Sequence, residues 1–225
     1  MILDSEITRN LYNPKVRKAT LEEALYKVNN PSQVGHIELV QQWAIIGECY
    51  KLERKSIASE KAYKKAFALA QEIDDVVMSG SVLKHLGNAM YFCNEYQKAI
   101  NYYKLALKIF EQRQSFSELM NIYSQISYAY EKLGNRKQER DFLRYAIAIS
   151  DIEPVIQGNF IERLALSLVD SKRYTEAAEN YEKALSLYES ENFKKGWQER
   201  IRNLAQIYNL IGDKEVEKQT LQRLL

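Results

Sequence analysis

The sequence predicts an all-α protein: an α-α superhelix of about five helix-turn-helix repeats that follow an N-terminal capping helix. The 225 residues include only 3 Pro and 8 Gly, too few to build the turns of an all-β fold. Helix-forming Ala, Leu, Glu, Lys and Gln are plentiful, and a hydrophobic content of 46% is enough to bury a core. A pattern of small and large side chains also returns about every 40 residues, which indicates an internal repeat.

The first expected element is a capping helix at residues 13–30, within an N-terminal extension of residues 1–36. Pro14 and a Thr20-x-x-Glu23 capping box indicate its beginning. Its apolar positions are Leu21, Ala24, Leu25 and Val28. We interpret this helix as the degenerate half of a further repeat that caps the stack.

The first helix of each repeat, helix A, is indicated by a small residue between two large apolar ones. The small residues stand at successive spacings of 40, 40, 38 and 40: Gly47, Gly87, Ser127, Ala165 and Ala205. A bulky aliphatic residue precedes each of them: Ile46, Leu86, Ile126, Leu164 and Leu204. Another large apolar side chain follows three positions later: Tyr50, Met90, Tyr130, Leu168 and Tyr208.

The second helix, helix B, is indicated 12, 16 and 19 residues after the small residue, at offsets that share one helical face. The complete sets are Ser59, Tyr63, Ala66; Ala99, Tyr103, Ala106; and Ala177, Tyr181, Ala184. The third and fifth repeats carry weaker sets, which predict looser packing: Glu139, Leu143, Ala146; and Glu217, Leu221, Leu224. The repeats are expected to fill residues 37–225, at approximately 37–76, 77–116, 117–153, 155–193 and 195–225.

A single helix pair cannot bury its apolar face, so each pair must stack on its neighbours. We expect a right-handed superhelix in which helix A lines an open concave groove and helix B lies outside. The chain ends in Leu221, Leu224 and Leu225 with no polar helix after them. Because a solenoid end normally needs a polar cap, we expect a homodimer through the C-terminal repeat.

These residues resemble the tetratricopeptide repeat family, whose pattern is an aromatic residue, Leu-Gly, a Tyr, and later Ala, an aromatic residue and Ala. The first repeat carries it in Trp43, Ile46, Gly47, Tyr50, Tyr63 and Ala66. The second carries it best, in Lys84-His85-Leu86-Gly87-Asn88 with Ala99, Tyr103 and Ala106. The resemblance covers residues 37–225 and, with a period of 40 instead of 34, is closest to the longer-helix variant. It implies that the groove binds a peptide or a partner helix.

Helix phase predicts which side chains of helix A face the groove, namely those one position after the small residue or two or three before it. In the fourth repeat the same phase is extended one turn earlier, and the aromatic residues that repeat packing does not use are added. The candidate groove residues are then Lys84, Asn88, Tyr91, Gln125, Tyr128, Asn159, Arg163, Arg202, Asn203 and Gln206. His85, Phe92, Ser124 and Glu162 join the same surface. Amide side chains form hydrogen bonds with the backbone of an extended peptide, and Arg can donate two parallel hydrogen bonds to a carboxylate.

Five of these positions resemble the carboxylate clamp of tetratricopeptide domains that hold the C-terminal carboxylate of cytosolic chaperones. Lys84, Asn88 and Arg163 match in residue type and place. Gln125 stands where the clamp has an asparagine, and Asn159 where it has a lysine. The alternative is that Lys84 and Arg163 are ordinary solvated charges on a helical face.

Catalytic, metal and nucleic-acid functions find little support in the sequence. The two histidines, His36 and His85, have no partner at metal-ligand spacing, and neither cysteine has a His in a motif context. The glycines are scattered singly, so no phosphate-binding loop is formed. Because 32 basic and 30 acidic residues nearly cancel, the net charge does not indicate a nucleic-acid binder. We therefore expect no enzyme, cofactor, metal or nucleic-acid partner.

The sequence is typical of a cytoplasmic protein. Cys49 and Cys93 lie inside apolar helical patterns, which suits reduced, buried thiols better than a disulfide framework. Acidic Asp4 and Glu6 stand where a signal peptide has basic residues, and no apolar run approaches the roughly 18 residues of a membrane span.

Three functions remain open at this point. The first is a scaffold or adaptor that binds a protein or peptide in the groove. The second is a regulator similar to bacterial sensors of signalling peptides, although the 36 or so residues before the repeats are too few for a helix-turn-helix effector domain. The third is a structural subunit whose contacts lie at the ends of the stack.

Overall fold

The computed structural model describes residues 3, 5–149 and 152–224, which form two compact units, residues 1–133 and 134–225. Within these described residues the regular structure is helical throughout, so the predicted all-α fold is confirmed. The predicted C-terminal Leu225 lies outside the described residues.

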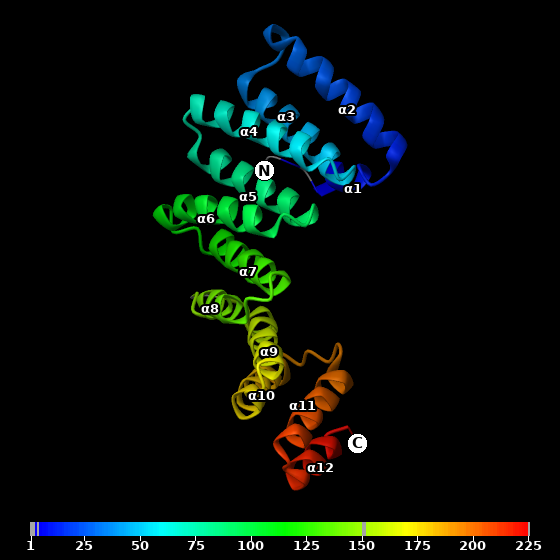
Figure 1. Cartoon of the computed structure of the whole chain (residues 1–225), viewed down its shortest axis with the longest axis vertical. Helices are drawn as coiled ribbons and strands as arrows, with labels where there is room; N and C mark the ends of the chain where they lie inside the picture. Colours follow the sequence, from blue (N-terminus) through cyan, green and yellow to red (C-terminus); the bar gives the residue numbers. More distant parts are fainter. Residues whose placement is uncertain (1–2, 4, 150–151, 225) are drawn as a thin grey trace. The chain divides into compact units, whose positions relative to one another are not determined.

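The first unit holds seven α-helices and a short 3-10 helix among its described residues (Figure 1). They are α1 (Ser5–Asn10), α2 (Pro14–Asn29), η1 (Pro31–Gln33), α3 (His36–Leu52), α4 (Ser56–Glu72), α5 (Val76–Phe92), α6 (Tyr96–Gln112) and α7 (Phe116–Lys132). From α3 onward every helix has 17 residues and every connection has three, so α3, α5 and α7 begin 40 residues apart. The α3–α4 and α5–α6 pairs pack closely, and α4 packs on α5.

The second unit contains α8 (Arg136–Ile147), α9 (Pro154–Asp170), α10 (Tyr174–Ser190), α11 (Trp197–Ile211) and α12 (Lys214–Gln222). α9 packs against α10 and α8, and α11 packs against α10 and α12. The connection between α10 and α11, residues 191–196, is twice as long as the regular three-residue turn. The connection between α8 and α9 is equally long and α8 has only 12 residues, so the repeat is less regular in the second unit than in the first.

The short turns share one backbone conformation, which keeps the spacing constant. Their middle residues lie in the left-handed region, for example Arg54 with φ 56° and Asn94 with φ 66°. The next residue then donates its N–H back into the helix, as Lys55 does to the carbonyl oxygen of Tyr50 at 2.9 Å. This bond satisfies a carbonyl that the helix end leaves free and turns the chain back on itself.

The small residue of each repeat is the contact point between helices A and B. All five of the predicted small residues are buried. A Cβ atom added to Gly47 would lie 2.6 Å from the Tyr63 ring, and one added to Gly87 would lie 2.5 Å from the Tyr103 ring. The helices approach so closely there because glycine leaves room for the ring of the opposite tyrosine.

The N-terminal capping helix is present as α2, which packs on α3. Its beginning agrees with the predicted range of 13–30: the N-cap is Asn13, whose Oδ1 accepts a hydrogen bond from the Lys15 backbone N–H at 3.0 Å. The proposed capping box at Thr20 and Glu23 is wrong, since both residues lie inside the helix. Pro14 stands at the first helical position, so the helix begins about two turns before Thr20.

The last helix also packs differently from its repeat pattern. Leu221, at the position where other repeats bury a tyrosine, is 40% exposed, and Thr220 is the buried residue of α12. Leu210 and Ile211 at the end of α11 are exposed as well. The C-terminal repeat thus leaves apolar side chains uncovered in the second unit.

A charge cluster joins α4 to α6 on the helix B side and gives the first unit a testable pH dependence. Glu60 accepts hydrogen bonds from the Tyr102 hydroxyl at 2.6 Å and from Lys98 at 3.3 Å, and it pairs with Lys64 at 2.8 Å. Burial alone would raise the pKa of Glu60, but the bonds from Lys64 and Tyr102 outweigh it and lower that pKa to about 2.

We expect Glu60→Gln to lower the free energy of unfolding by about 1–2 kcal/mol at pH 7. The folded-state pKa lies below the unfolded value of about 4.3, so the carboxylate stabilises the fold above that value. The difference from the parent should then shrink as the pH falls toward 2. Urea unfolding at pH 7, 4 and 2.5 measures this. Glu72→Gln is the control, because Glu72 is exposed and has no ion pair among the described residues. Equal stability of the parent and Glu60→Gln at pH 7 contradicts the prediction.

Candidate functional site

The candidate groove residues of the first unit lie on two neighbouring A helices. Lys84, Asn88 and Tyr91 belong to α5, and Gln125 and Tyr128 belong to α7. α5 contacts α3 on one side and α7 on the other. The A helices of this unit therefore share one face, as the helix phase predicts.

Several of these side chains already have partners inside the first unit. Lys84 Nζ pairs with Glu118 Oε2 at 2.7 Å, and Asn88 Oδ1 accepts a hydrogen bond from the Tyr103 hydroxyl at 2.8 Å. The Tyr91 ring meets Tyr96 edge to face, with centroids 5.3 Å apart. Gln125 is half-buried, whereas Tyr128 is exposed. Asn88 on α5 thus contacts α6 through Tyr103. A ligand that bound Lys84 would compete with Glu118.

The candidate residues of the second unit lie on α9 and α11. Asn159 and Arg163 belong to α9, and Arg202, Asn203 and Gln206 belong to α11. Asn159, Arg202 and Gln206 are exposed, and the other two are half-buried. The five clamp-like positions are therefore divided: Lys84, Asn88 and Gln125 belong to the first unit, and Asn159 and Arg163 to the second.

A cavity of about 460 Å³ lies between α9, α11 and the 191–196 connection. Its lining residues are Asn159, Glu162, Leu166, Phe193, Lys195, Gly196, Glu199, Arg200 and Asn203. Of the predicted second-unit residues, Asn159 and Asn203 line it and Arg163, Arg202 and Gln206 do not. The cavity is concave, partly apolar and supplied with a few converging polar groups, as binding sites commonly are.

Glu162 is the centre of the cavity floor, where both of its carboxylate oxygens are used. Oε1 accepts from the Tyr181 hydroxyl at 2.9 Å, and Oε2 accepts from Arg200 Nε at 2.8 Å. The Tyr188 hydroxyl lies 2.9 Å from the same Oε2 and 2.8 Å from Asn159 Oδ1. Tyr181 and Arg200 therefore hold the carboxylate from two sides, while the Tyr188 hydroxyl, which has one proton, donates to either Glu162 Oε2 or Asn159 Oδ1.

Arg200 closes the network from α11. Its guanidinium carbon lies 4.1 Å from the centroid of the Tyr188 ring and 5.6 Å from that of Phe193. Burial works against its charged form, but the hydrogen bond and charge of Glu162 outweigh burial and raise the pKa of Arg200. Burial together with Glu162 also raises the pKa of Tyr188. The cavity floor is therefore a neutralised ion pair stacked on aromatic rings.

Two amide groups remain available at the walls of this cavity. Asn159 uses only its oxygen and Asn203 only its Nδ2, which donates to the Tyr181 hydroxyl at 3.2 Å, among the described residues. The Nδ2 of Asn159 is thus a free donor and the Oδ1 of Asn203 a free acceptor. One donor and one acceptor are what the backbone of an extended peptide requires.

Three general features complete the description. No group of three or more His, Cys, Asp or Glu side chains among the described residues is placed to hold a metal ion. Burial raises the pKa of the Cys49 thiol to about 12, so this thiol is protonated at neutral pH. In the part of the chain that the structure describes, every helix is too short or too polar to span a bilayer.

Comparison with known families agrees with this geometry. Residues 160–191, which cover most of α9 and all of α10, match the tetratricopeptide repeat family. Residues 160–191 therefore have the sequence of a tetratricopeptide repeat. The family resemblance predicted from the sequence is confirmed, while its assignment to a 40-residue variant stays a prediction. No curated protein matches the sequence.

Solved structures with tetratricopeptide-like folds are similar to the chain at low identity. BtubC (BKLC) from P. vanneervenii is 18% identical with a TM-score of 0.69, over 98% of this chain and 90% of that one. The apo form of RapI is 14% identical with a TM-score of 0.77, over 89% and 56%. The apo form of the quorum sensor NprR from B. thuringiensis is 14% identical with a TM-score of 0.63, over 96% and 61%. These identities show the fold alone, and the chain spans little more than half the length of RapI and NprR.

Five lining residues of the cavity between α9 and α11 escape the rule used for groove residues: Phe193, Lys195, Gly196, Glu199 and Arg200. Arg200 stands five positions before the small residue Ala205, where the second, third and fourth repeats have Val82, Ile122 and Phe160. Those three side chains are buried and apolar. A charged residue at an otherwise apolar repeat position was the signal that could have found Arg200. Phe193 lies in the long connection, outside any repeat position.

Proposed function

We propose that the chain is a protein-interaction scaffold that binds an extended peptide, or a partner helix, on the face formed by its A helices. The observation that carries this proposal is the cavity between α9 and α11. Its floor is fixed by the Glu162–Arg200 pair, and its walls offer the Asn159 and Asn203 amides to a ligand. Because the floor is already ordered, a ligand binds with a smaller entropic cost for ordering side chains of the protein.

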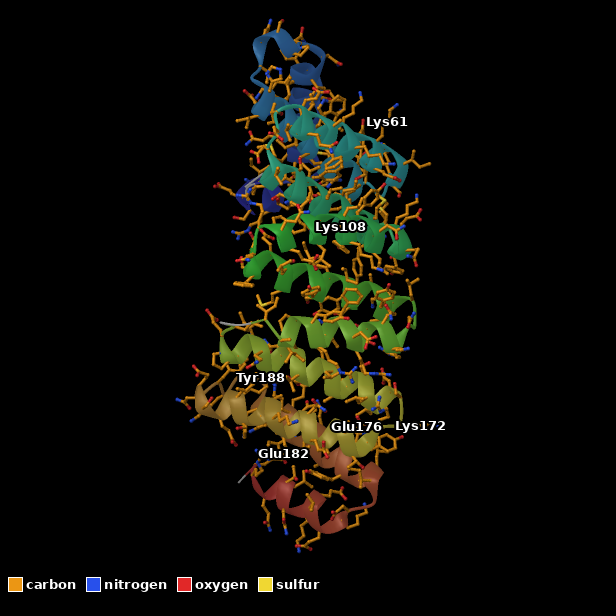
Figure 2. All side chains as sticks on the ribbon, turned by 90° about the vertical axis from the view of Figure 1, so that its left-hand side faces the viewer. Lys61, Lys108, Lys172, Glu176, Glu182 and Tyr188 are labelled. Carbon is orange, nitrogen blue, oxygen red and sulfur yellow. The ribbon has the colours of Figure 1, made fainter. Side chains whose placement is uncertain are left out.

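The helix A face is favoured over the helix B face because the cavity and the free amides lie on α9 and α11. The B helices carry exposed charges such as Lys61 on α4 and Lys108 on α6, both labelled in Figure 2. Neither lysine has a partner among the described residues. They supply a matched control surface for binding experiments.

The test is selection of 12-residue peptides on the immobilised protein, followed by titration calorimetry with the parent and its variants. We expect Asn159→Leu and Asn203→Leu each to lower the affinity for the selected peptides about tenfold, because each substitution removes one hydrogen bond to the peptide backbone. The Lys61→Ala, Lys108→Ala double variant should bind as the parent does. If the asparagine variants keep full affinity while this control loses it, the cavity is not the binding site.

A Lys84→Ala, Arg163→Ala double variant belongs in the same experiment. It tests the resemblance to a carboxylate clamp, which stays a proposal. Peptides with a free C-terminal carboxylate should lose affinity with this variant, and peptides with an amidated C-terminus should not. Unchanged affinity for both forms excludes the clamp and leaves Lys84 as the partner of Glu118.

The second candidate is a peptide-responsive regulator, and the folds of RapI and NprR support it. In such a protein a bound peptide changes the shape of the repeats, whereas a scaffold keeps it. Small-angle X-ray scattering with and without a selected peptide separates the two functions. Cytoplasmic location and a homodimer through the C-terminal repeat, where α11 and α12 leave Leu210, Ile211 and Leu221 exposed, are further proposals.

A further inference from the structure

A second cavity, of about 310 Å³, lies in the first unit where α1, α2 and α3 meet. Aliphatic side chains form part of its lining: Ile7, Leu11, Val16 and Ile45. The polar lining residues are Asn10, Thr20, Glu23, Lys27 and Gln42. Its volume is at the lower end of the roughly 300–1,000 Å³ that ligand sites occupy. It is separate from the cavity between α9 and α11, and the proposed function makes no use of it.

Gln42 is the feature of this cavity that packing does not explain. The residue is only 8% exposed, yet its amide has no hydrogen-bonding partner among the described residues. Its polar atoms are not sealed inside the protein, because no fully buried side-chain N or O atom of the described residues lacks a partner. The amide therefore opens into the cavity that it lines. A buried amide is costly unless a group with hydrogen-bonding capacity meets it.

The repeats supply an internal reference for this position. Gln42 stands five residues before the small residue Gly47, and Val82 and Ile122 stand at the same place in the next two repeats of the unit. Both are fully buried aliphatic residues. An amide replaces an aliphatic side chain only in the repeat that borders the cavity. The replacement has no benefit for packing, which points to recognition of a ligand.

The charges at the cavity exclude an anionic ligand. Lys27 Nζ lies 3.0 Å from Glu23 Oε1 and 3.3 Å from Glu38 Oε1, so two carboxylates surround one ammonium group. An added anion would meet an excess of negative charge there. The aliphatic walls suit an apolar body, and the Gln42 amide can both donate and accept a hydrogen bond.

We propose that the cavity between α1, α2 and α3 binds a phenol group, such as the side chain of a tyrosine in a partner protein, and that Gln42 recognises its hydroxyl. The ring fills the space between Ile7, Leu11, Val16 and Ile45. The hydroxyl, which is both donor and acceptor, satisfies the amide that the fold leaves without a partner. The site belongs to the first unit and does not depend on the peptide site of the second.

The experiment compares p-cresol with toluene, which has nearly the same shape but no hydroxyl. Each compound is titrated into the full chain, and the methyl NMR signals of Ile7, Leu11 and Ile45 monitor its binding. We expect p-cresol to shift these signals and to bind at least tenfold more tightly than toluene. Gln42→Met, which keeps the side-chain length but removes the hydrogen bonds, should bring the two affinities within twofold of each other.

Circular dichroism shows whether Gln42→Met is folded. If it is not, Gln42→Val serves the same purpose, because Val82 shows that the position accepts valine in the next repeat. The proposal is overturned if p-cresol leaves the three methyl signals unshifted, or if the folded Gln42 variant binds p-cresol as tightly as the parent does. In either case the amide faces only solvent. Peptide binding at Asn159 and Asn203 is measured separately, so its outcome does not affect this one.

Discussion

Glu162→Leu should lower the free energy of unfolding of the second unit by about 3 kcal/mol, the largest effect that we expect from a single substitution outside the small residues. The change removes the acceptor of Arg200 Nε and of the Tyr181 hydroxyl. The Arg200 side chain is only 15% exposed and would remain charged with no carboxylate to balance it, although it still donates to the Lys195 carbonyl oxygen. A charge left alone in a half-buried site costs more than the ion pair contributed.

The measurement is urea unfolding in a Trp43→Phe background, with the fluorescence of Trp197 as the probe. The chain has two tryptophans, so Trp197 then reports on the second unit alone. Glu199→Leu is the control, because Glu199 lines the same cavity but is exposed and has no partner among the described residues. It should change stability by less than about 0.5 kcal/mol. A Glu162→Leu, Arg200→Leu double variant should recover much of the loss, since it removes both charges. Equal stability of parent and Glu162→Leu contradicts the role given to this pair.

Gly87→Ala should destabilise the first unit by about 1–3 kcal/mol, although alanine usually favours a helix interior by about 1 kcal/mol over glycine. The added Cβ would lie 2.5 Å from Cδ1 and Cε1 of Tyr103, a fully buried ring. To make room, the ring must move, and its hydroxyl must leave Asn88 Oδ1, which it now meets at 2.8 Å. Overpacking and a lost hydrogen bond thus act together.

Urea unfolding in a Trp197→Phe background, with Trp43 as the probe of the first unit, measures this effect. Gly35→Ala is the matched control, because no heavy atom lies within 4 Å of its added Cβ. It should cost less than about 1 kcal/mol, the usual effect of alanine at an N-cap. A Gly87→Ala chain that is more stable than the parent would show that the ring yields without cost, and the close approach of helices A and B would then not depend on glycine.

The sequence by itself determined the class of the fold and the faces of its helices. The position of Gly87 predicts what packs against it, because the offset of 16 residues within each repeat places Tyr103 opposite, and both residues are buried as expected. The same reasoning found the helix A face and, on it, Asn159 and Asn203 beside the cavity. Periodicity carries this information because burial is a property of a whole helical face and is repeated in every unit.

The tertiary structure alone decided which polar atoms meet and where the cavities lie. Lys84 was predicted as a groove cation, yet Glu118 of α7 pairs with it. Arg200 was not predicted, yet it completes the Glu162 network. Gln42 stands at the same repeat position as Arg200, and only the fold shows that its amide lines a cavity. A hydrogen bond depends on distances of a few tenths of an ångström between side chains that come from different helices. Repeat spacing fixes which face a residue is on, but it does not fix such distances, so these contacts follow only from the packed fold.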